Sequence, residues 1–91
     1  MRRGTSRAVI GFEEVAFADY WQWASEDKRI FNKITTLITE IMRDPFHGTG
    51  KPEPLKGNWS GHWSRRITQE HRLIYKVFSD HIIITSCKNH Y

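Results

Sequence analysis

The clearest pattern in the chain is a stripe of apolar residues at helical spacing between residues 30 and 42. Its members are Ile30, Phe31, Ile34, Leu37, Ile38, Ile41 and Met42. Ser25, followed by two acidic residues, is predicted to cap the start of this helix. Asp44 and Pro45 are predicted to end it, because the residue before proline is pushed out of the helical region. The stripe therefore predicts an amphipathic helix that packs on a sheet.

A shorter pattern precedes this helix. Residues 8–12 have the apolar character of a short strand. Glu13 and Glu14 then place negative charge in the first turn of a helix, where it interacts favourably with the helix dipole. Residues with the spacing i, i+3, i+4 and i+7 are predicted to form one face of that helix. They are Phe17, Tyr20, Trp21 and Ala24.

The second half of the chain has the alternating pattern of β-strands. Residues 63–68 and 72–77 alternate, with a turn at residues 69–71 between them. Residues 82–87 are apolar on both faces, which predicts a central strand of the sheet.

An irregular segment connects the helical half to these strands. Residues 46–50 are predicted to form a loop. Pro52 and Pro54 exclude a regular central strand, because proline has no N–H for the ladder. Glu53, which lies between them, is therefore expected in a stiff, extended segment.

These elements predict an α+β fold. An N-terminal strand and two helices are expected to pack on one face of a mainly antiparallel sheet, in one small domain. We assign residues 8–91 to this domain and residues 1–7, which are basic and rich in small residues, to a flexible N-terminal extension. The other face of the sheet is then left to basic and aromatic residues, which makes it the candidate functional surface.

The charge of the chain is unevenly distributed. Residues 51–91 contain seven basic and three acidic residues, whereas residues 1–50 contain seven of each, so the net charge of +4 lies in the C-terminal part. Basic residues interleaved with aromatic ones suit a ligand with phosphates and bases, or an acidic protein that masks them. A basic surface that serves only solubility is the alternative interpretation.

Cysteine content and hydropathy indicate where in the cell the protein is expected. Cys87 is the only cysteine, so no intramolecular disulfide forms, and its apolar surroundings predict a buried small side chain. No apolar segment approaches the roughly 20 residues of a membrane-spanning helix. We therefore expect a cytoplasmic protein without membrane association.

The candidate chemistry is acid–base catalysis on RNA. The histidines and the cysteine have no zinc-binding spacing, and no nucleophile motif is present, so neither a metal nor another cofactor is predicted. RNA carries its own nucleophile, the 2′-hydroxyl. Its cleavage needs a base, an acid and cations that stabilise the phosphate in the transition state. Glutamate, histidine and arginine supply these groups, but many basic domains contain all three.

Longer motifs give this chemistry a context. Over roughly residues 8–91 the chain resembles the YoeB family of bacterial toxins, within the RelE superfamily of ribosome-dependent mRNA interferases. The matching residues are Trp23, Asp27-Lys28-Arg29-Ile30, Arg43-Asp44-Pro45-Phe46, Gly48, Gly50-Lys51-Pro52-Glu53-Pro54-Leu55-Lys56, Ser60-Gly61, Trp63-Ser64-Arg65-Arg66-Ile67, Glu70-His71-Arg72-Leu73, Tyr75 and His90-Tyr91. Residues 1–7 extend beyond the usual start of the family, which leaves the true start codon open.

The resemblance implies a toxin of a type II toxin–antitoxin system that enters the ribosomal A site and cuts mRNA. It implies Glu53 as the general base and His90 as the general acid. Arg72 would stabilise the phosphate, and Arg66 would be a further catalytic or phosphate-binding arginine. The residues that would bind RNA are Lys51, Lys56, Arg65 and Tyr91.

Structural roles for several of these residues are kept as alternatives. Arg65 alternates with Trp63 and Ile67, so its alternative role is to pair with a carboxylate and support the fold. His71 lies in a predicted turn, so its alternative role is only to cap that turn. Glu53 would form only a surface salt bridge with a neighbouring lysine.

Partners and competing functions follow from the same resemblance. A cognate acidic, YefM-like antitoxin is expected to wrap the basic face. Operator DNA would be bound only through the antitoxin complex, and a homodimer is compatible with the sequence. The competing functions are a binding module that blocks the A site without cutting, and a ribonuclease that acts without the ribosome.

Overall fold

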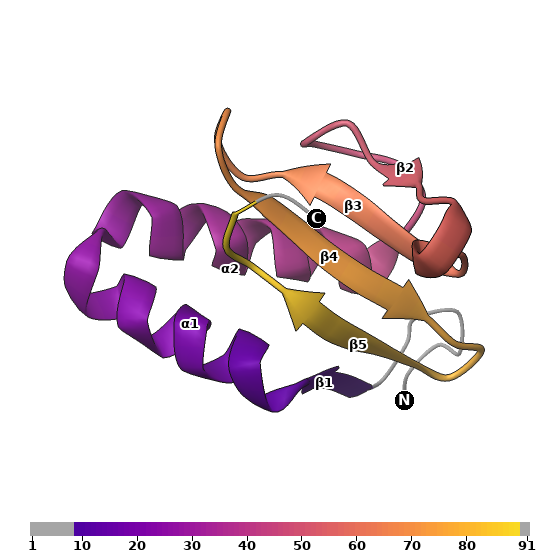
Figure 1. Cartoon of the computed structure of the whole chain (residues 1–91), viewed down its shortest axis with the longest axis horizontal. Helices are drawn as coiled ribbons and strands as arrows, with labels where there is room; N and C mark the ends of the chain where they lie inside the picture. The colour runs from indigo at the N-terminus through magenta and orange to yellow at the C-terminus, as the bar shows by residue number, and fades with distance from the viewer. Residues whose placement is uncertain (1–8, 90–91) are drawn as a thin grey trace.

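The computed structural model describes residues 9–89, which form two helices and a five-stranded sheet (Figure 1). The predicted flexible extension of residues 1–7 lies outside the described residues. The elements are β1 (Val9–Phe12), α1 (Glu14–Glu26), α2 (Lys28–Arg43), β2 (Glu53–Pro54), a 3₁₀ turn (Gly57–Trp59), β3 (His62–Arg66), β4 (Arg72–Val77) and β5 (His81–Ser86). Within residues 9–89 no helix is long and apolar enough to cross a membrane.

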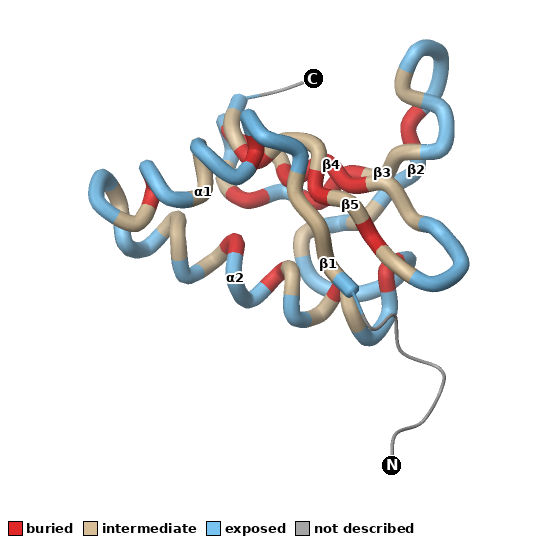
Figure 2. Tube along the Cα trace, turned by 90° about the horizontal axis from the view of Figure 1, so that it is seen from below, coloured by how far each residue is buried: buried red, intermediate tan, exposed pale blue. Residues whose placement is uncertain are grey.

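The sheet has the strand order β1-β5-β4-β3-β2. β1 pairs with β5 in parallel, and the other neighbouring strands are antiparallel. The core lies between the helices and the sheet, and Figure 2 shows the buried segments gathered there. The predicted α+β fold, with helices on one face of a mainly antiparallel sheet, is therefore confirmed. β5 has a neighbour on each side, as predicted, although β4 is the middle strand.

A single residue, Asp27, separates the two helices. Its backbone N–H donates to the Trp23 carbonyl at the end of α1, and its carboxylate accepts the N–H groups of Arg29 and Ile30 at the start of α2. This is the geometry of a helix N-cap. The prediction that Ser25 caps α2 is wrong, because Ser25 lies within α1. Serine and aspartate are both good N-cap residues, so the apolar spacing alone did not show which of Ser25 and Asp27 begins the helix.

The buried face of α1 also differs from the prediction. Ala16 and Trp23 are buried, whereas Phe17 and Trp21 are 49% and 58% exposed. Apolar side chains occur around most of this helix, so their spacing did not decide which of them face the sheet. Trp23 is held inward because its indole N–H donates to the carbonyl of Cys87 at 3.0 Å.

Cys87 follows β5 and is completely buried, as expected. Its thiol donates to the carbonyl of Ala16 in α1. Burial raises the pKa of this thiol to about 12, and the charge of Asp19 adds to the effect. The thiol is therefore protonated at neutral pH and behaves as a small apolar side chain.

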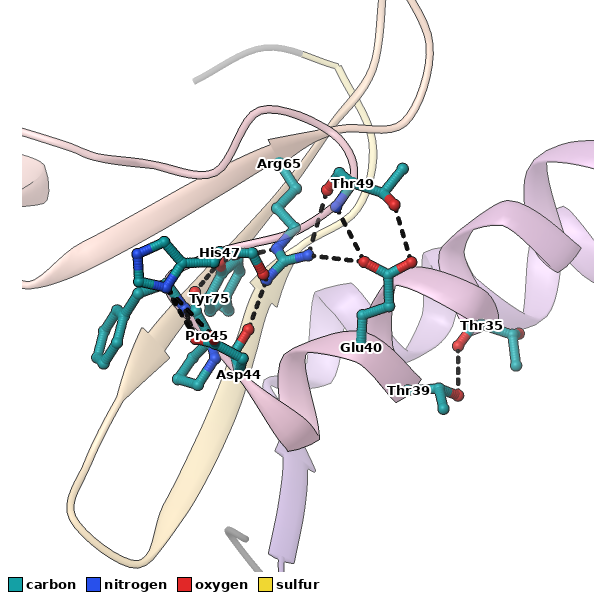
Figure 3. Close-up of polar contacts among 10 residues, drawn as sticks. Thr35, Thr39, Glu40, Asp44, Pro45, His47, Thr49, Arg65 and Tyr75 are labelled. Atoms are coloured by element: carbon teal, nitrogen blue, oxygen red, sulfur yellow. Dashed lines mark hydrogen bonds and ion pairs between the residues drawn. The ribbon is translucent and has the colours of Figure 1, made fainter. Parts of the chain in front are cut away.

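Arg65 lies on the helix-facing side of β3 and is completely buried. All five of its N–H groups donate hydrogen bonds, two from Nη1, two from Nη2 and one from Nε (Figure 3). Nε donates to the Tyr75 hydroxyl of β4 at 3.1 Å, and Nη1 donates to the Glu40 carboxylate of α2 at 3.2 Å. The Tyr75 hydroxyl in turn donates to the carbonyl of Pro45 at 2.6 Å.

The remaining donors of Arg65 hold the loop between α2 and β2. Nη2 donates to the carbonyls of Asp44 and His47 at 2.7 and 2.8 Å, and Nη1 donates to the carbonyl of Thr49 at 3.2 Å. The N–H and hydroxyl of Thr49 donate to Glu40, and they are the main reason that the pKa of this carboxyl lies below its usual range. The loop is therefore tied to α2 and β3 at several points.

The predicted role of Arg65 in RNA binding is therefore wrong for this structure. A guanidinium with no exposed surface and all five donors in use has nothing left to offer a phosphate. The alternative interpretation, a carboxylate-paired residue that supports the fold, is the one observed. Gly48 fits the same cluster, because an added Cβ would lie 2.9 Å from Nη1 of Arg65 and 2.8 Å from Oε1 of Glu40.

Replacing Arg65 with methionine is expected to lower the free energy of unfolding by about 3 kcal/mol, because several buried acceptors lose their donor together. Arg66→Met is the matched control, since this neighbour is exposed, and we expect a change within about 0.5 kcal/mol. Urea denaturation followed by circular dichroism measures both. Equal stability of the two variants would contradict the role given to Arg65.

The thiol of Cys87 is expected to react with Ellman's reagent about 100-fold more slowly in the folded protein than in urea at pH 8, because burial and a raised pKa both suppress the thiolate. The absorbance of the released thionitrobenzoate measures the rate. A comparable rate in the two states would show that the region around Cys87 opens readily.

Candidate functional site

Strand register places several of the predicted site residues on one face of the sheet. Glu53 in β2 is opposite Ser64 in β3, and Arg66 at the end of β3 is opposite Arg72 at the start of β4. Residues directly opposite each other, and residues two apart in one strand, point to the same side of a sheet. Arg65, between Ser64 and Arg66, points to the helices. Glu53, Arg66 and Arg72 therefore share the face away from the helices.

A basic pocket lies where β3 turns into β4. It has a volume of about 420 Å³ and is lined by Arg66, Thr68, Gln69 and Arg72. Arg66 is exposed and Arg72 is half-buried. Two guanidinium groups in one pocket of this size suit a single phosphate group better than an extended apolar ligand.

The turn at residues 67–71 holds Arg72 in this pocket. Nη1 of Arg72 donates to the carbonyls of Thr68 and Gln69 at 2.8 and 3.1 Å. The hydroxyl of Thr68 accepts the N–H groups of Glu70 and His71, which closes the turn. Arg72 is therefore oriented by the backbone before any ligand binds.

Lys51, Glu53 and Lys56 are all exposed along the segment that forms the edge strand β2. Leu55 anchors this segment, since its side chain is buried and its N–H donates to the carbonyl of His62 in β3. Lys51 has a φ of 52°, so the chain turns sharply just before Glu53. The three charged side chains therefore sit on a fixed backbone beside β3.

The remaining predicted site residues, His90 and Tyr91, lie outside the described residues. The chain up to Asn89 ends beside the pocket, because the N–H of Arg72 donates to the carbonyl of Asn89 at 3.0 Å. The register of the strands therefore brings Arg66 and Arg72 into one pocket and Glu53 onto the same face of the sheet.

Three residues at this site received no functional role from the sequence. Thr68 and Gln69 line the pocket, and His71, next to Arg72 in the chain, is buried, with its Nδ1 accepting the N–H of Asn89 at 2.8 Å. His71 is within the motif Glu70-His71-Arg72, so the signal was present. A turn-capping role explained this motif position equally well. The contact that distinguishes the two roles joins residues far apart in the sequence, so no local pattern reveals it.

Comparisons with known proteins identify the family of this chain. The family model described as "YoeB-like toxin of bacterial type II toxin-antitoxin system" matches residues 12–91. Toxin YoeB of Escherichia coli K12 is 54% identical over 80 residues, which cover 88% of this chain and 95% of that protein.

Solved structures show the same relationship. A structure of the YoeB dimer from Staphylococcus aureus has 47% identity and a TM-score of 0.86, covering 94% of this chain and all of the other. A YoeB–YefM complex from the same organism has 47% identity and a TM-score of 0.84, covering 90% of this chain and 95% of the other. The match of the family model, the identity and the coverage together show that this chain belongs to the family of YoeB-like toxins of bacterial type II toxin–antitoxin systems.

Proposed function

We propose that this toxin is an endoribonuclease that cleaves mRNA in the ribosomal A site and thereby inhibits translation. The observation that carries the proposal is the pairing of Arg66 with Arg72 across β3 and β4 in one pocket, with Glu53 on the same face. Family membership supports the toxin role. The pocket supports a phosphate as the reacting group.

The chemistry uses the RNA's own hydroxyl group. Glu53 takes the proton of the 2′-hydroxyl, and the 2′-oxygen attacks the adjacent phosphorus. The bond from phosphorus to the 5′-oxygen breaks, and His90 protonates that oxygen. The products are a 2′,3′-cyclic phosphate and a 5′-hydroxyl, so the two proton transfers balance.

The arginines act on the charge of the phosphate. The phosphoryl oxygens gain negative charge as phosphorus becomes pentacoordinate, and donors already in place stabilise that charge most effectively. Arg72, held by turn carbonyls, is suited to this role because it needs little reorganisation. Arg66, exposed at the end of β3, is suited to bind the same or a neighbouring phosphate.

The flanking residues would hold the RNA strand. Lys51 and Lys56 place positive charge on both sides of Glu53, where the backbone of a single strand would pass. Tyr91 is proposed to stack on or position a nucleotide. A protein that only blocked the A site would use the lysines and arginines in the same way but would have no need of Glu53 or His90.

The partners follow from the family and the charge. A YefM-like acidic antitoxin is proposed to cover the basic surface, because YoeB from Staphylococcus aureus has been solved in complex with YefM. A homodimer is proposed because a YoeB dimer from the same organism has been solved. Contact with operator DNA is proposed only through the antitoxin complex.

Glu53→Gln and His90→Gln are each expected to slow single-turnover cleavage on programmed ribosomes by roughly 10²–10⁴-fold, the usual contribution of an acid–base group. Arg72→Ala is expected to slow it by roughly 10²–10³-fold, the usual contribution of one donor that stabilises developing negative charge. The control is Glu14→Gln, which removes an exposed carboxylate from the start of α1. Circular dichroism checks that each variant is folded. A folded set of three variants that cleaved at the normal rate would refute these catalytic assignments, whereas an unaltered chain that cut no mRNA on the ribosome would leave only a binding function.

Removing the charge of Lys51 or Lys56 is expected to flatten the salt dependence of binding to single-stranded RNA, since each phosphate contact contributes a slope of about −0.7. Lys51→Asn suits this test, because asparagine tolerates the positive φ of residue 51. Lys56→Gln is the second variant, and Lys28→Gln on α2 is the control. Unchanged slopes, measured by fluorescence anisotropy, would remove both lysines from the binding surface.

A further inference from the structure

His71 is buried at the junction of the β3–β4 turn and the end of the described chain. It is 8% exposed, and its Nδ1 accepts the backbone N–H of Asn89 at 2.8 Å. The next residue, Arg72, donates its backbone N–H to the carbonyl of Asn89 at 3.0 Å. Both peptide groups that flank the Cα of Asn89 are therefore held by consecutive residues of one turn.

The His71 ring is itself held in one orientation. It packs edge-on against Trp23 of α1, with ring centroids 4.9 Å apart. Trp23 is fixed in turn by its bond to the carbonyl of Cys87. Because Nδ1 accepts a hydrogen bond, the ring is neutral with its proton on Nε2. Nε2 lies 3.7 Å from the Glu70 carboxylate, which favours the proton on that side.

The chain bends at the point where His71 holds it. Asn89 has a φ of 63°, in the left-handed region that asparagine tolerates better than most residues. Termini fray unless bonds tie them down. The hydrogen bonds to His71 and Arg72 thus fix the backbone of Asn89 next to Arg72, one of the residues that line the pocket.

We propose that His71 is a positioning residue for His90. It acts through its Nδ1 bond to Asn89, the residue that directly precedes the general acid; this rests on the catalytic role proposed above for His90. His71 takes no part in proton transfer itself, because its ring is buried and its Nδ1 is already bonded. The same turn therefore orients both Arg72 and the residue that protonates the leaving oxygen.

A pair of substitutions separates the hydrogen bond from packing. Asparagine places an oxygen acceptor the same number of bonds from the backbone as Nδ1 of histidine, whereas leucine places a methyl group there. His71→Leu is expected to lower the single-turnover rate at saturating ribosomes by about 10²-fold or more, the loss expected when an acid is misplaced. The ribosome concentration at half-saturation is expected to stay the same. His71→Asn is expected to restore most of the rate.

A double variant tests whether His71 acts through His90. In a His90→Gln background, His71→Leu is expected to cause no further loss of rate, because residues that act as a unit are not additive. Multiplicative losses would overturn the proposal, as would a normal rate for His71→Leu in the presence of His90. A normal rate for His90→Gln alone would instead refute the acid assignment itself, so the two failures are distinguishable.

Substitutions at Asn89 give the same test without altering the buried ring. Asn89→Gly keeps the N–H and the positive φ, whereas Asn89→Pro removes the N–H and fixes φ near −65°. The glycine variant is expected to cleave normally and the proline variant to lose activity to the same extent as His71→Leu. Equal activity of the two would overturn the proposal even if His71→Leu failed to fold.

Discussion

The buried guanidinium of Arg65 is the interaction on which the arrangement of the site depends. It joins α2, the loop before β2, β3 and β4 through five hydrogen bonds, and three of these hold the loop that leads toward Glu53. Because side chains alternate along a strand, fixing Arg65 on the helix side also fixes Arg66 on the opposite side. Two adjacent arginines therefore differ: Arg65 is buried and holds the scaffold together, and Arg66 is exposed on the face that carries the candidate site.

Local patterns were sufficient for most of the elements but not for their contacts. The apolar stripe predicted α2, and the alternating pattern predicted the strands, because the period of each pattern reflects which residues are buried. The choice of Asp27 over Ser25 as the N-cap depended on where α1 ends, and the exposure of Phe17 and Trp21 depended on how α1 is rotated against the sheet. The buried role of Arg65 required acceptors far away in the sequence.

The residues of the candidate site were not predicted from local patterns. Glu53, Arg66 and Arg72 are separated along the chain, and no periodicity connects them; a resemblance of motifs named them together, and strand register then placed them on one face. His71 shows what a motif does not reveal. Its position in the motif was visible in the sequence, whereas the positioning role proposed for it depends on a contact with Asn89 that only the folded chain makes.

The parallel pairing of β1 with β5 has a consequence for synthesis. Within the described sheet β1 lies at an edge and pairs only with β5. During synthesis β1 therefore cannot join the sheet until β5 has also left the ribosome. Contacts between distant segments form late because a long loop has to close first. A nascent chain that stops before residue 81 has no partner for β1 and no interior strand beside β4. The toxin fold is therefore completed only after β5 has left the ribosome, long after β1 has been made.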